Sequence, residues 1–393
     1  MKRITIADSL RGFSLLGIFL ANLLIFQFSL SGKDYIEHFH LSPVNQGIFN
    51  LIIILVEESF LPIFAILFGF SMDKLYQSMK LKGLPRPRLK LLRRAIFLLI
   101  LGFIHASYIW EGDILLAYSL AMLCVIPFIS LSTKAFKWFN IVIISFMLVM
   151  GIWSMFDDSQ TSTSSDKYDS ASYIHKVQKI YTEGSYNDIH HVDDIATSPK
   201  FAKLEDQLGD NKGAIFLIAI LFEVPLFTLG IFLSRCGWFE KDAKHFWTSK
   251  LFIYLIPVSI FAKSTILWLD NEAISGTLVA IFGSILSLGY MSLFKYLYQR
   301  YETHPIFKGL ENAGKISLTI YISQSIIGTL IFYSYGLGLF GKDILIYTSI
   351  LFVIIYIVLV LLATLHQRYF RYGPLEYLLR MFTYWKWHVG KRK

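Results

Sequence analysis

Two ionisable residues lie inside apolar stretches of the chain, where their chemistry is expected to matter most. Glu58 belongs to the apolar run Gly47–Met72, and His105 belongs to the run Ala95–Trp110. Ionisable groups are costly within a bilayer and often mark functional sites there. At a rise of about 1.5 Å per residue, Glu58 lies about 17 Å from the start of its run and His105 about 15 Å from the start of its own. The matching depths predict an acid–base pair, although a histidine bonded to a neighbouring helix and a glutamate facing water are simpler alternatives.

A second carboxylate follows His105 closely along the chain. Asp113 lies at the end of the segment Gly102–Asp113, where one apolar run turns into the next. From there it could orient a catalytic histidine or an acceptor hydroxyl. Aspartate before Ile-Leu-Leu-Ala is also a normal helix start, so an N-cap is the alternative interpretation. The two roles are compatible.

Arginine residues gather at the ends of two apolar runs. Asp8 and Arg11 are spaced to share one helix face, where a local ion pair is expected. Arg93 and Arg94 directly precede the run that contains His105. Together with Arg11 they would form a guanidinium cluster suited to phosphate. Ordinary flanking charge on the cytoplasmic side of a membrane helix is the alternative interpretation of Arg93 and Arg94.

Further polar side chains are candidates to line a site between helices. Asn22 is expected at a depth similar to that of the acid–base pair, and Tyr321 and Gln324 form a polar stripe at helical spacing. Hydrogen bonding between helices is the alternative role for the stripe. Near the carboxyl end, Glu376 and Arg380 are spaced as an i, i+4 pair on a Pro-initiated amphipathic helix.

Long apolar elements must position these residues. The chain has 393 residues, of which 55% are hydrophobic and 17% charged, and its mean hydropathy is +0.53. A water-soluble fold of this length could not bury so much apolar surface, whereas a membrane helix needs roughly 20 apolar residues. Such runs are Phe13–Leu30, Gly47–Met72, Ala95–Trp110, Ile114–Leu131, Ala135–Phe156, Ala214–Ser234, Phe246–Leu269, Ile274–Leu293, Ile316–Tyr335 and Ile344–His366. The sequence therefore predicts an all-α, polytopic integral membrane protein of about ten transmembrane helices.

The distribution of basic residues predicts the orientation of these helices. With the N-terminus inside, most of the 37 Lys and Arg residues fall on the cytoplasmic side, many of them between Lys74 and Arg94. This positive-inside bias predicts that both termini are cytoplasmic. It also accounts for the net charge of +9, so nucleic acid is not expected as a partner.

A single long polar connection divides the chain. The predicted parts are a five-helix membrane half at 1–156, an extracytoplasmic loop at 157–212, a second five-helix half at 213–367 and a cytoplasmic interfacial tail at 368–393. Within the loop, Tyr173–Tyr181 and Phe201–Leu208 are predicted to form short helices that lie on the membrane or over a site.

Several common catalytic patterns do not occur. The sequence has no glycine-rich phosphate loop, no HExxH and no GxSxG, which argues against an ATP-driven pump, a zinc protease and a serine hydrolase. His190 and His191 are adjacent but have no further metal-ligand spacing around them, and Cys124 and Cys236 lie far apart. Neither a metal site nor a tightly bound cofactor is expected.

Several motifs occur together in an order that is specific to one family. They are Asp8-Ser-Leu-Arg11-Gly12 with Gly17 and Asn22, Phe64–Gly69, Arg93-Arg94, Gly102–His105, Gly112-Asp113, and Gly373-Pro374-Leu375-Glu376 with Arg380. Nearly end to end, this arrangement resembles the YeiB-like bacterial membrane proteins, which are grouped under a domain of unknown function. That family is similar to the transmembrane acyltransferase superfamily, which includes the lysosomal heparan glucosaminide N-acetyltransferase and bacterial sugar O-acetyltransferases.

The resemblance implies a multi-pass protein of the bacterial cytoplasmic membrane that moves an acyl group across the bilayer. The donor would be acetyl-CoA or another acyl-CoA, and the acceptor an extracytoplasmic envelope glycan or lipid. Arg11, Arg93 and Arg94, with Asp8 beside them, would hold the diphosphate of the donor. His105 would deprotonate the acceptor.

From the residues alone, Glu58 or Asp113 would orient His105 as the base. The alternative is a secondary transporter or permease in which Glu58, His105 and Lys263 form a proton or substrate path. A non-catalytic membrane partner of an envelope system is the third possibility. The lipid bilayer is the expected surrounding in each case, and a homo-oligomer is left open.

Overall fold

All regular elements that the structure describes are helices. The computed structural model describes residues 4–155, 169–199, 202, 212–240, 250–269 and 271–386. The predicted loop at 157–212 is therefore described only in part. Apart from Ala202, the helix predicted at Phe201–Leu208 lies outside the described residues, as does the end of the predicted tail, 387–393. Within the described ranges no strand occurs, so the all-α prediction is confirmed.

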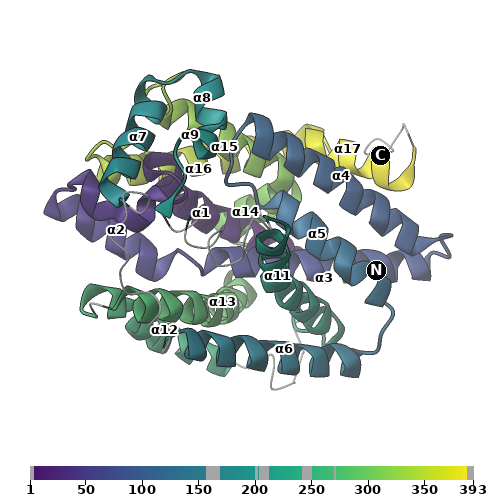
Figure 1. The fold of residues 1–393 in the computed structure, drawn as a ribbon. Coiled ribbons are helices and arrows are strands. Elements are labelled where there is room, and N and C mark those ends of the chain that lie inside the picture. The colour runs from purple at the N-terminus through teal and green to yellow at the C-terminus, as the bar shows by residue number, and fades with distance from the viewer. Residues whose placement is uncertain are drawn as a thin grey trace.

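The helices follow one another along the chain as shown in Figure 1. In the amino-terminal part they are α1 (Thr5–Phe28), η1 (Gly32–Phe39), α2 (Pro43–Leu55), α3 (Phe60–Leu81), α4 (Pro87–Tyr108), α5 (Leu115–Val125), η2 (Ile126–Phe128) and α6 (Thr133–Ser154). The next are α7 (Ser170–Glu183), α8 (Tyr186–His190), α9 (Val192–Ile195) and α11 (Lys212–Arg235). The last are η6 (Lys250–Tyr254), α12 (Leu255–Lys263), η7 (Ser264–Leu267), α13 (Glu272–Tyr301), α14 (Pro305–Lys315), α15 (Ser317–Phe332), α16 (Leu345–Tyr369) and α17 (Pro374–Tyr384).

Fewer helices than predicted are long and apolar enough to cross a membrane. Within the described residues there are 5 candidate spans, or 6 if α14 and α15, which meet at an angle of 87°, count as one. The prediction of about ten spans is not confirmed, because several apolar runs form helices too short to cross alone. Helix α5 has 11 residues and α12 has 9, against the roughly 20 that a span needs. The cytoplasmic placement of both termini and the division into two five-helix halves stay predictions.

Helix α1 is the central element, and glycine lets α14 cross it at very short range. A Cβ atom built on Gly12 would lie 2.1 Å from the carbonyl oxygen of Leu310, and one built on Gly314 would lie 1.8 Å from that of Asp8. Small residues at such crossings allow helix backbones to touch. The crossing holds the α14–α15 corner against the first turns of α1.

Gly314→Ala is therefore expected to destabilise the protein strongly. The new methyl would overlap the backbone of α1, which cannot move by itself, and overpacking of this kind costs roughly 1–3 kcal/mol or more. The thermal unfolding midpoint of the purified protein in detergent measures the effect. Gly276→Ala in α13 is the matched control, because nothing lies within 4 Å of its added Cβ. An unchanged Tm for Gly314→Ala would contradict the close crossing.

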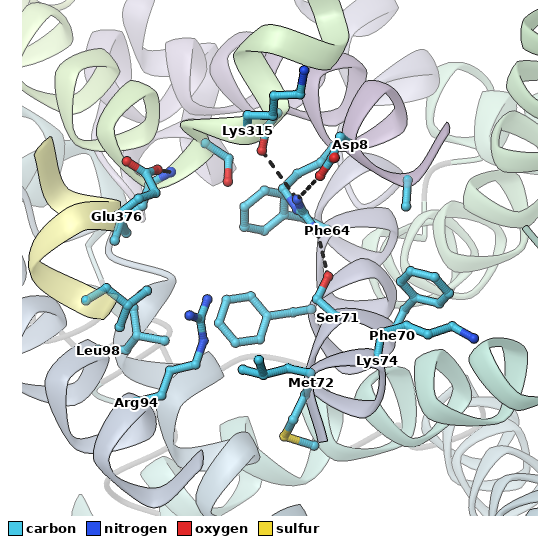
Figure 2. Close-up of a pocket in the computed structure, with 18 of the residues that line it drawn as sticks. Asp8, Phe64, Phe70, Ser71, Met72, Lys74, Arg94, Leu98, Lys315 and Glu376 are labelled. Carbon is cyan, nitrogen blue, oxygen red and sulfur yellow. Dashed lines mark hydrogen bonds and ion pairs between the residues drawn. The ribbon is translucent and has the colours of Figure 1, made fainter. Parts of the chain in front are cut away.

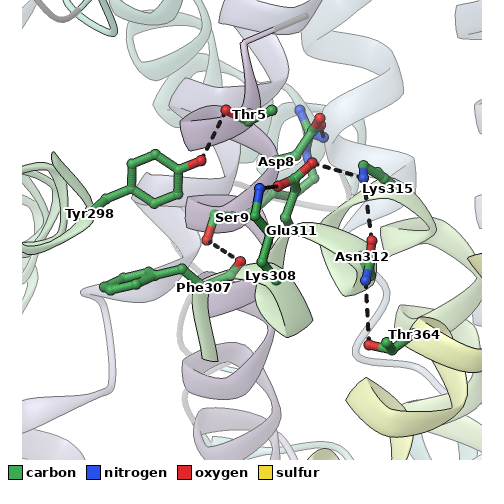
Figure 3. A network of polar contacts seen from close by, with 11 residues as sticks. Thr5, Asp8, Ser9, Tyr298, Phe307, Lys308, Glu311, Asn312, Lys315 and Thr364 are labelled. Atoms are coloured by element: carbon green, nitrogen blue, oxygen red, sulfur yellow. Dashed lines mark hydrogen bonds and ion pairs between the residues drawn. The ribbon is translucent and has the colours of Figure 1, made fainter. Parts of the chain in front are cut away.

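The polar network around α14 anchors the same corner (Figure 3). Glu311 forms ion pairs with Lys308 at 3.4 Å and with Lys315 at 2.8 Å. Ser9 of α1 donates to the carbonyl oxygen of Phe307 at 3.1 Å. These contacts fix the position of Lys315 and of the turn that starts α15.

Helix α2 and helix α3 are separated by a break within the predicted run Gly47–Met72. Glu58 lies in this break with a left-handed φ of 56°, and a Cβ on Gly283 of α13 would lie 2.6 Å from its carbonyl oxygen. The buried ammonium of Lys263 donates to the carbonyl oxygen of Glu57 and, at 3.0 Å, to the hydroxyl of Ser59. Lys263 thus compensates backbone groups that the broken helix leaves without partners.

Part of the predicted loop forms a cap over one end of α1. The predicted helix at Tyr173–Tyr181 is confirmed as part of α7, which Figure 1 shows grouped with α8 and α9 at one corner of the molecule. Tyr181 stacks on Phe340 with ring centroids 4.4 Å apart and donates to Glu111 at 2.9 Å. The amide of Ser334 donates to the carbonyl oxygen of Tyr181 at 2.9 Å. The cap is therefore packed on the ends of the membrane helices.

Candidate functional site

A buried histidine and a buried aspartate meet where α4 turns into α5. Nδ1 of His105 lies 2.8 Å from Oδ1 of Asp113, and the two side chains are 0% and 1% exposed. The other carboxylate oxygen of Asp113 accepts the amide of Leu116 at 2.7 Å at the start of α5. Asp113 thus contacts His105 and caps a helix, which are the two compatible roles considered for it. Gly102 leaves room for the contact, since a Cβ there would lie 2.8 Å from the Asp113 carboxylate.

Tyr321 of α15 completes this cluster. Its hydroxyl accepts the amide of Ile114 at 3.1 Å and donates to Oδ1 of Asp113 at 3.4 Å. Its ring centroid lies 5.3 Å from that of His105. Nε2 of His105 is buried and has no hydrogen-bond partner among the described residues. Nε2 is thus the imidazole nitrogen that Asp113 does not contact.

Glu58 is not part of this cluster, so the prediction that it pairs with His105 is wrong. The depth argument assumed an unbroken helix, whereas Glu58 sits exposed in the break between α2 and α3. Its charge instead interacts with Lys263 and with Glu223 of α11. The carboxylate that contacts His105 is that of Asp113.

A cavity of about 430 Å³ leads from the first turns of α1 to Tyr321. Its walls come from α1, α3, α4, the start of α5, the α14–α15 corner and α17. The charged residues on the walls are Asp8, Arg11, Lys74, Arg94, Lys315, Glu376 and Arg380. Basic groups outnumber acidic ones, so the cavity favours an anionic ligand. The start of α1 and helix α17 line the same cavity, so they lie at the same end of the molecule.

Arg11 is held in the wall of the cavity by several contacts. Its guanidinium group pairs with Asp8 at 3.1 Å, donates to the carbonyl oxygen of Gly314 at 3.3 Å, and donates to the hydroxyl of Ser71 (Figure 2). The local ion pair considered for Asp8 and Arg11 is therefore present. Arg11 still presents positive charge to the cavity, but it is already committed to protein partners.

Arg94 lines the cavity and makes no hydrogen bond or ion pair with any described residue. Figure 2 shows its side chain directed into the cavity. The positive charges of Arg11 and Arg380 repel it. An anionic ligand placed between them would relieve this repulsion and supply charge-assisted hydrogen bonds.

Arg93 does not join the cluster, which corrects the sequence prediction. Its guanidinium carbon lies 5.2 Å above the ring of Trp385, and the residue does not line the cavity. Successive residues on a helix point about 100° apart, so Arg93 and Arg94 cannot both face one cavity. Arg380 of α17 takes the place predicted for Arg93.

Glu376 also differs from its predicted role. Its carboxylate accepts the amides of Leu318 at 2.8 Å and Thr319 at 3.2 Å, and the hydroxyl of Thr319 at 2.6 Å. It therefore caps the N-terminus of α15, where negative charge is stabilised by the helix dipole. Arg380 lies instead over the ring of Tyr372 at 4.5 Å.

The remaining predicted lining residues are buried but do not line the cavity. Gln324 is 2% exposed and donates to the carbonyl oxygen of Leu15 at 3.3 Å, which is an interhelical hydrogen bond. Asn22 is 6% exposed on α1. Neither residue belongs to the walls of the 430 Å³ cavity.

The sequence reasoning missed one buried ion pair near the cavity. Asp73 of α3 is fully buried, pairs with Arg235 of α11 at 3.0 Å and accepts the hydroxyl of Ser234 at 2.6 Å. The sequence feature that could have indicated this pair is the carboxylate of Asp73, which directly follows the apolar run that ends at Met72. Across the described ranges, no group of three or more His, Cys, Asp or Glu residues is arranged to hold a metal ion.

The fold and the site define an all-helical protein with 5 to 6 candidate membrane spans and a cationic cavity next to a buried His–Asp pair. Residues 233–386 match the family model described as "Protein of unknown function (DUF418)".

Two similar proteins cover nearly the whole chain. The chain is 27% identical to the uncharacterized protein YxaH of Bacillus subtilis (strain 168), over 100% of this chain and 97% of that protein. It is 28% identical to the uncharacterized protein YeiB of Escherichia coli (strain K12), over 98% of this chain and 97% of that protein. No solved structure matches the chain. The chain is therefore similar, over nearly its whole length, to uncharacterized proteins that include YeiB.

Proposed function

We propose that this protein is a membrane-bound acyltransferase. One observation carries the proposal. The cationic cavity holds the guanidinium group of Arg94, which has no hydrogen bond or ion pair within the described ranges. The cavity reaches Tyr321, which hydrogen-bonds to the Asp113 that contacts His105. An anion site joined to an oriented imidazole is what transfer from a phosphate-bearing acyl donor requires.

The donor of this reaction is an acyl-CoA thioester, expected to be acetyl-CoA. Arg94 and Arg380, with Arg11 behind them, bind its phosphate groups through charge-assisted hydrogen bonds. Bound there, the donor extends along the cavity so that its thioester reaches Tyr321. No tightly bound cofactor is needed.

His105 acts as the general base toward an acceptor hydroxyl. Its Nε2 takes the hydroxyl proton as the acceptor oxygen attacks the thioester carbonyl carbon. The new oxygen–carbon bond forms, the carbon–sulfur bond breaks, and the proton passes from the imidazolium to the leaving thiolate. Asp113 holds the imidazole in the required orientation and stabilises its positive charge, as in other His–carboxylate pairs.

The acceptor approaches from the capped side of the protein. A second cavity of about 110 Å³ lies beneath the cap and is lined by Glu111, Tyr173 and Tyr181 among others. In the bacterial cytoplasmic membrane, with both termini in the cytoplasm, this side is extracytoplasmic. The acceptor is accordingly an envelope glycan or lipid, and a homo-oligomeric assembly is compatible with the reaction.

A second candidate function, ion-coupled transport, has one observation in its favour. Lys263, Glu58 and Glu223 form a separate ionisable group at the α2–α3 break, and the Oε2 atom of Glu223 is buried without a hydrogen bond among the described residues. Such groups occur on ion paths through membranes. His105 is paired with Asp113 instead, so a path through both Glu58 and His105 loses its basis.

The test of acyl transfer uses inverted membrane vesicles that contain the full-length protein and labelled acetyl-CoA. Label trapped covalently on a lipid or polymer, above vesicles without the protein, is the expected result. Label that accumulates inside the vesicles without covalent change would favour transport. Neither trapping nor accumulation would contradict both functions.

A further inference from the structure

We infer that the inner end of the cavity restricts the donor to short acyl chains, with Phe68 and Phe64 as the limiting wall. This inference rests on the proposed acyl transfer. It concerns the acyl group, which the cationic residues of the cavity do not select.

The cavity is polar at its mouth and apolar at its inner end. On α3 the lining residues Phe64, Phe68, Ser71, Leu75 and Ser78 recur every three or four residues and so form one stripe along the helix. Arg11 contacts this stripe at Ser71. From Ser71 to Phe64 the helix rises about 10 Å, so only two turns separate the cationic zone from the aromatic end.

An acyl chain attached to a thioester near Tyr321 must lie at this aromatic end. The other lining residues nearby are Leu98 and Leu115, which are also apolar. Toward the mouth the walls carry Arg94 and Glu376, which disfavour a hydrocarbon chain because it would cost them polar solvation. The wall formed by Phe64, Phe68, Leu98 and Leu115 carries no charged group and is thus a favourable place for the acyl group.

The aromatic wall is backed by solid packing. The ring of Phe68 lies 5.4 Å from that of Phe227 and 5.9 Å from that of Tyr118, and the ring of Phe64 lies 6.0 Å from that of Tyr118. Phe227 and Tyr118 are 0% and 1% exposed. A longer acyl chain therefore cannot displace these rings into free space.

The helix behind the wall cannot retreat either. A Cβ on Gly69 of α3 would lie 2.0 Å from the carbonyl oxygen of Phe227, and one on Gly230 of α11 would lie 2.0 Å from that of Ile66. The backbones of α3 and α11 are already in contact. The end of the cavity is consequently fixed, and each methylene beyond its length must overpack the wall.

The experiment compares acetyl-, butyryl- and octanoyl-CoA as donors for the full-length protein in vesicles. The natural protein is expected to prefer acetyl over octanoyl by at least tenfold in kcat/KM. In Phe68→Ala the ratio of octanoyl to acetyl transfer should rise at least tenfold, because burial of each added methylene contributes about fourfold. Phe68→Leu, which removes less volume, should give a smaller rise in the same direction and serves if Phe68→Ala does not accumulate.

Phe60→Ala is the matched control. Phe60 is a buried aromatic residue of the same helix, but it packs against Phe13 and Tyr290 and does not line the cavity. Phe60→Ala should leave the ratio of octanoyl to acetyl transfer unchanged. Preference of the natural protein for octanoyl-CoA, or an unchanged ratio in Phe68→Ala and Phe68→Leu while acetyl transfer persists, would overturn the inference. Absence of transfer from every donor would instead contradict the proposed function.

Discussion

His105→Gln is expected to reduce acyl transfer by a factor of about 10² to 10⁴, the usual contribution of a general base. Glutamine fills much of the same space but cannot accept and release a proton near neutral pH. Asp113→Asn should also lower transfer strongly, because an uncharged amide no longer stabilises the imidazolium that forms during the reaction. The rate of label transfer in vesicles at saturating donor measures both effects.

Two comparisons separate catalysis from folding in this experiment. Glu58→Gln is the control, since Glu58 sits at the α2–α3 break and not beside His105. Glu58→Gln should keep the rate of label transfer within about twofold of that of the natural protein, because the Glu58 carboxylate takes no part in the proton transfer. The double variant of His105 and Asp113 should be no slower than His105→Gln alone, because groups that act as one unit are not additive. Full transfer in His105→Gln, with normal protein levels, would rule out the proposed mechanism.

Arg94→Gln is expected to raise the KM for acetyl-CoA by about 10- to 100-fold and to change kcat much less. The range corresponds to the roughly 1.5–3 kcal/mol of a hydrogen bond to a charged group. Since Arg94 has no protein hydrogen bond or ion pair within the described residues and is repelled by Arg11 and Arg380, its loss should not lower the thermal unfolding midpoint. The weakened binding should also depend less on salt.

The neighbouring residue provides a matched control for Arg94. Arg93→Gln removes the same charge one position earlier, from a side chain that lies over Trp385 outside the cavity. The KM for acetyl-CoA should then stay within about twofold, because surface charges contribute little. Equal effects of the two substitutions would show that general positive charge, and not a directed guanidinium group, attracts the donor.

The residues of the His–Asp pair could be found from sequence, which left both Glu58 and Asp113 open as the carboxylate that orients His105, and the structure brings Asp113 to it. Residue types and positions singled out His105 and Asp113 correctly as close in the chain and compatible in chemistry. The depth estimate favoured Glu58 because it treated the run Gly47–Met72 as a continuous helix. The break at 56–59 contains no proline or glycine, and the one nearby signal, Pro62, lies in the first turn of α3, where proline is tolerated. It depends on Lys263 and Gly283, which come from distant helices.

The cationic cavity shows a similar limit. The sequence predicted that arginine would gather near the start of α1 and of α4, but hydropathy carries no information on which of Arg93 and Arg94 faces inward. Arg380 lines the cavity because α17 docks against the other helices, and the sequence pattern does not reveal this tertiary contact. The number of predicted spans was too high for a related reason. The apolar runs that form the short helices α5 and α12 have the same composition as runs that form full spans.

The contact between Glu376 and the start of α15 has a consequence for biosynthesis. Helix α17 is translated after every other helix of the described chain, yet it supplies both the cap of α15 and Arg380 on the cavity wall. A nascent chain whose earlier helices have already entered the bilayer therefore still has an incomplete cavity wall. Under the proposed function, the complete donor site would form only after α17 has left the ribosome and docked.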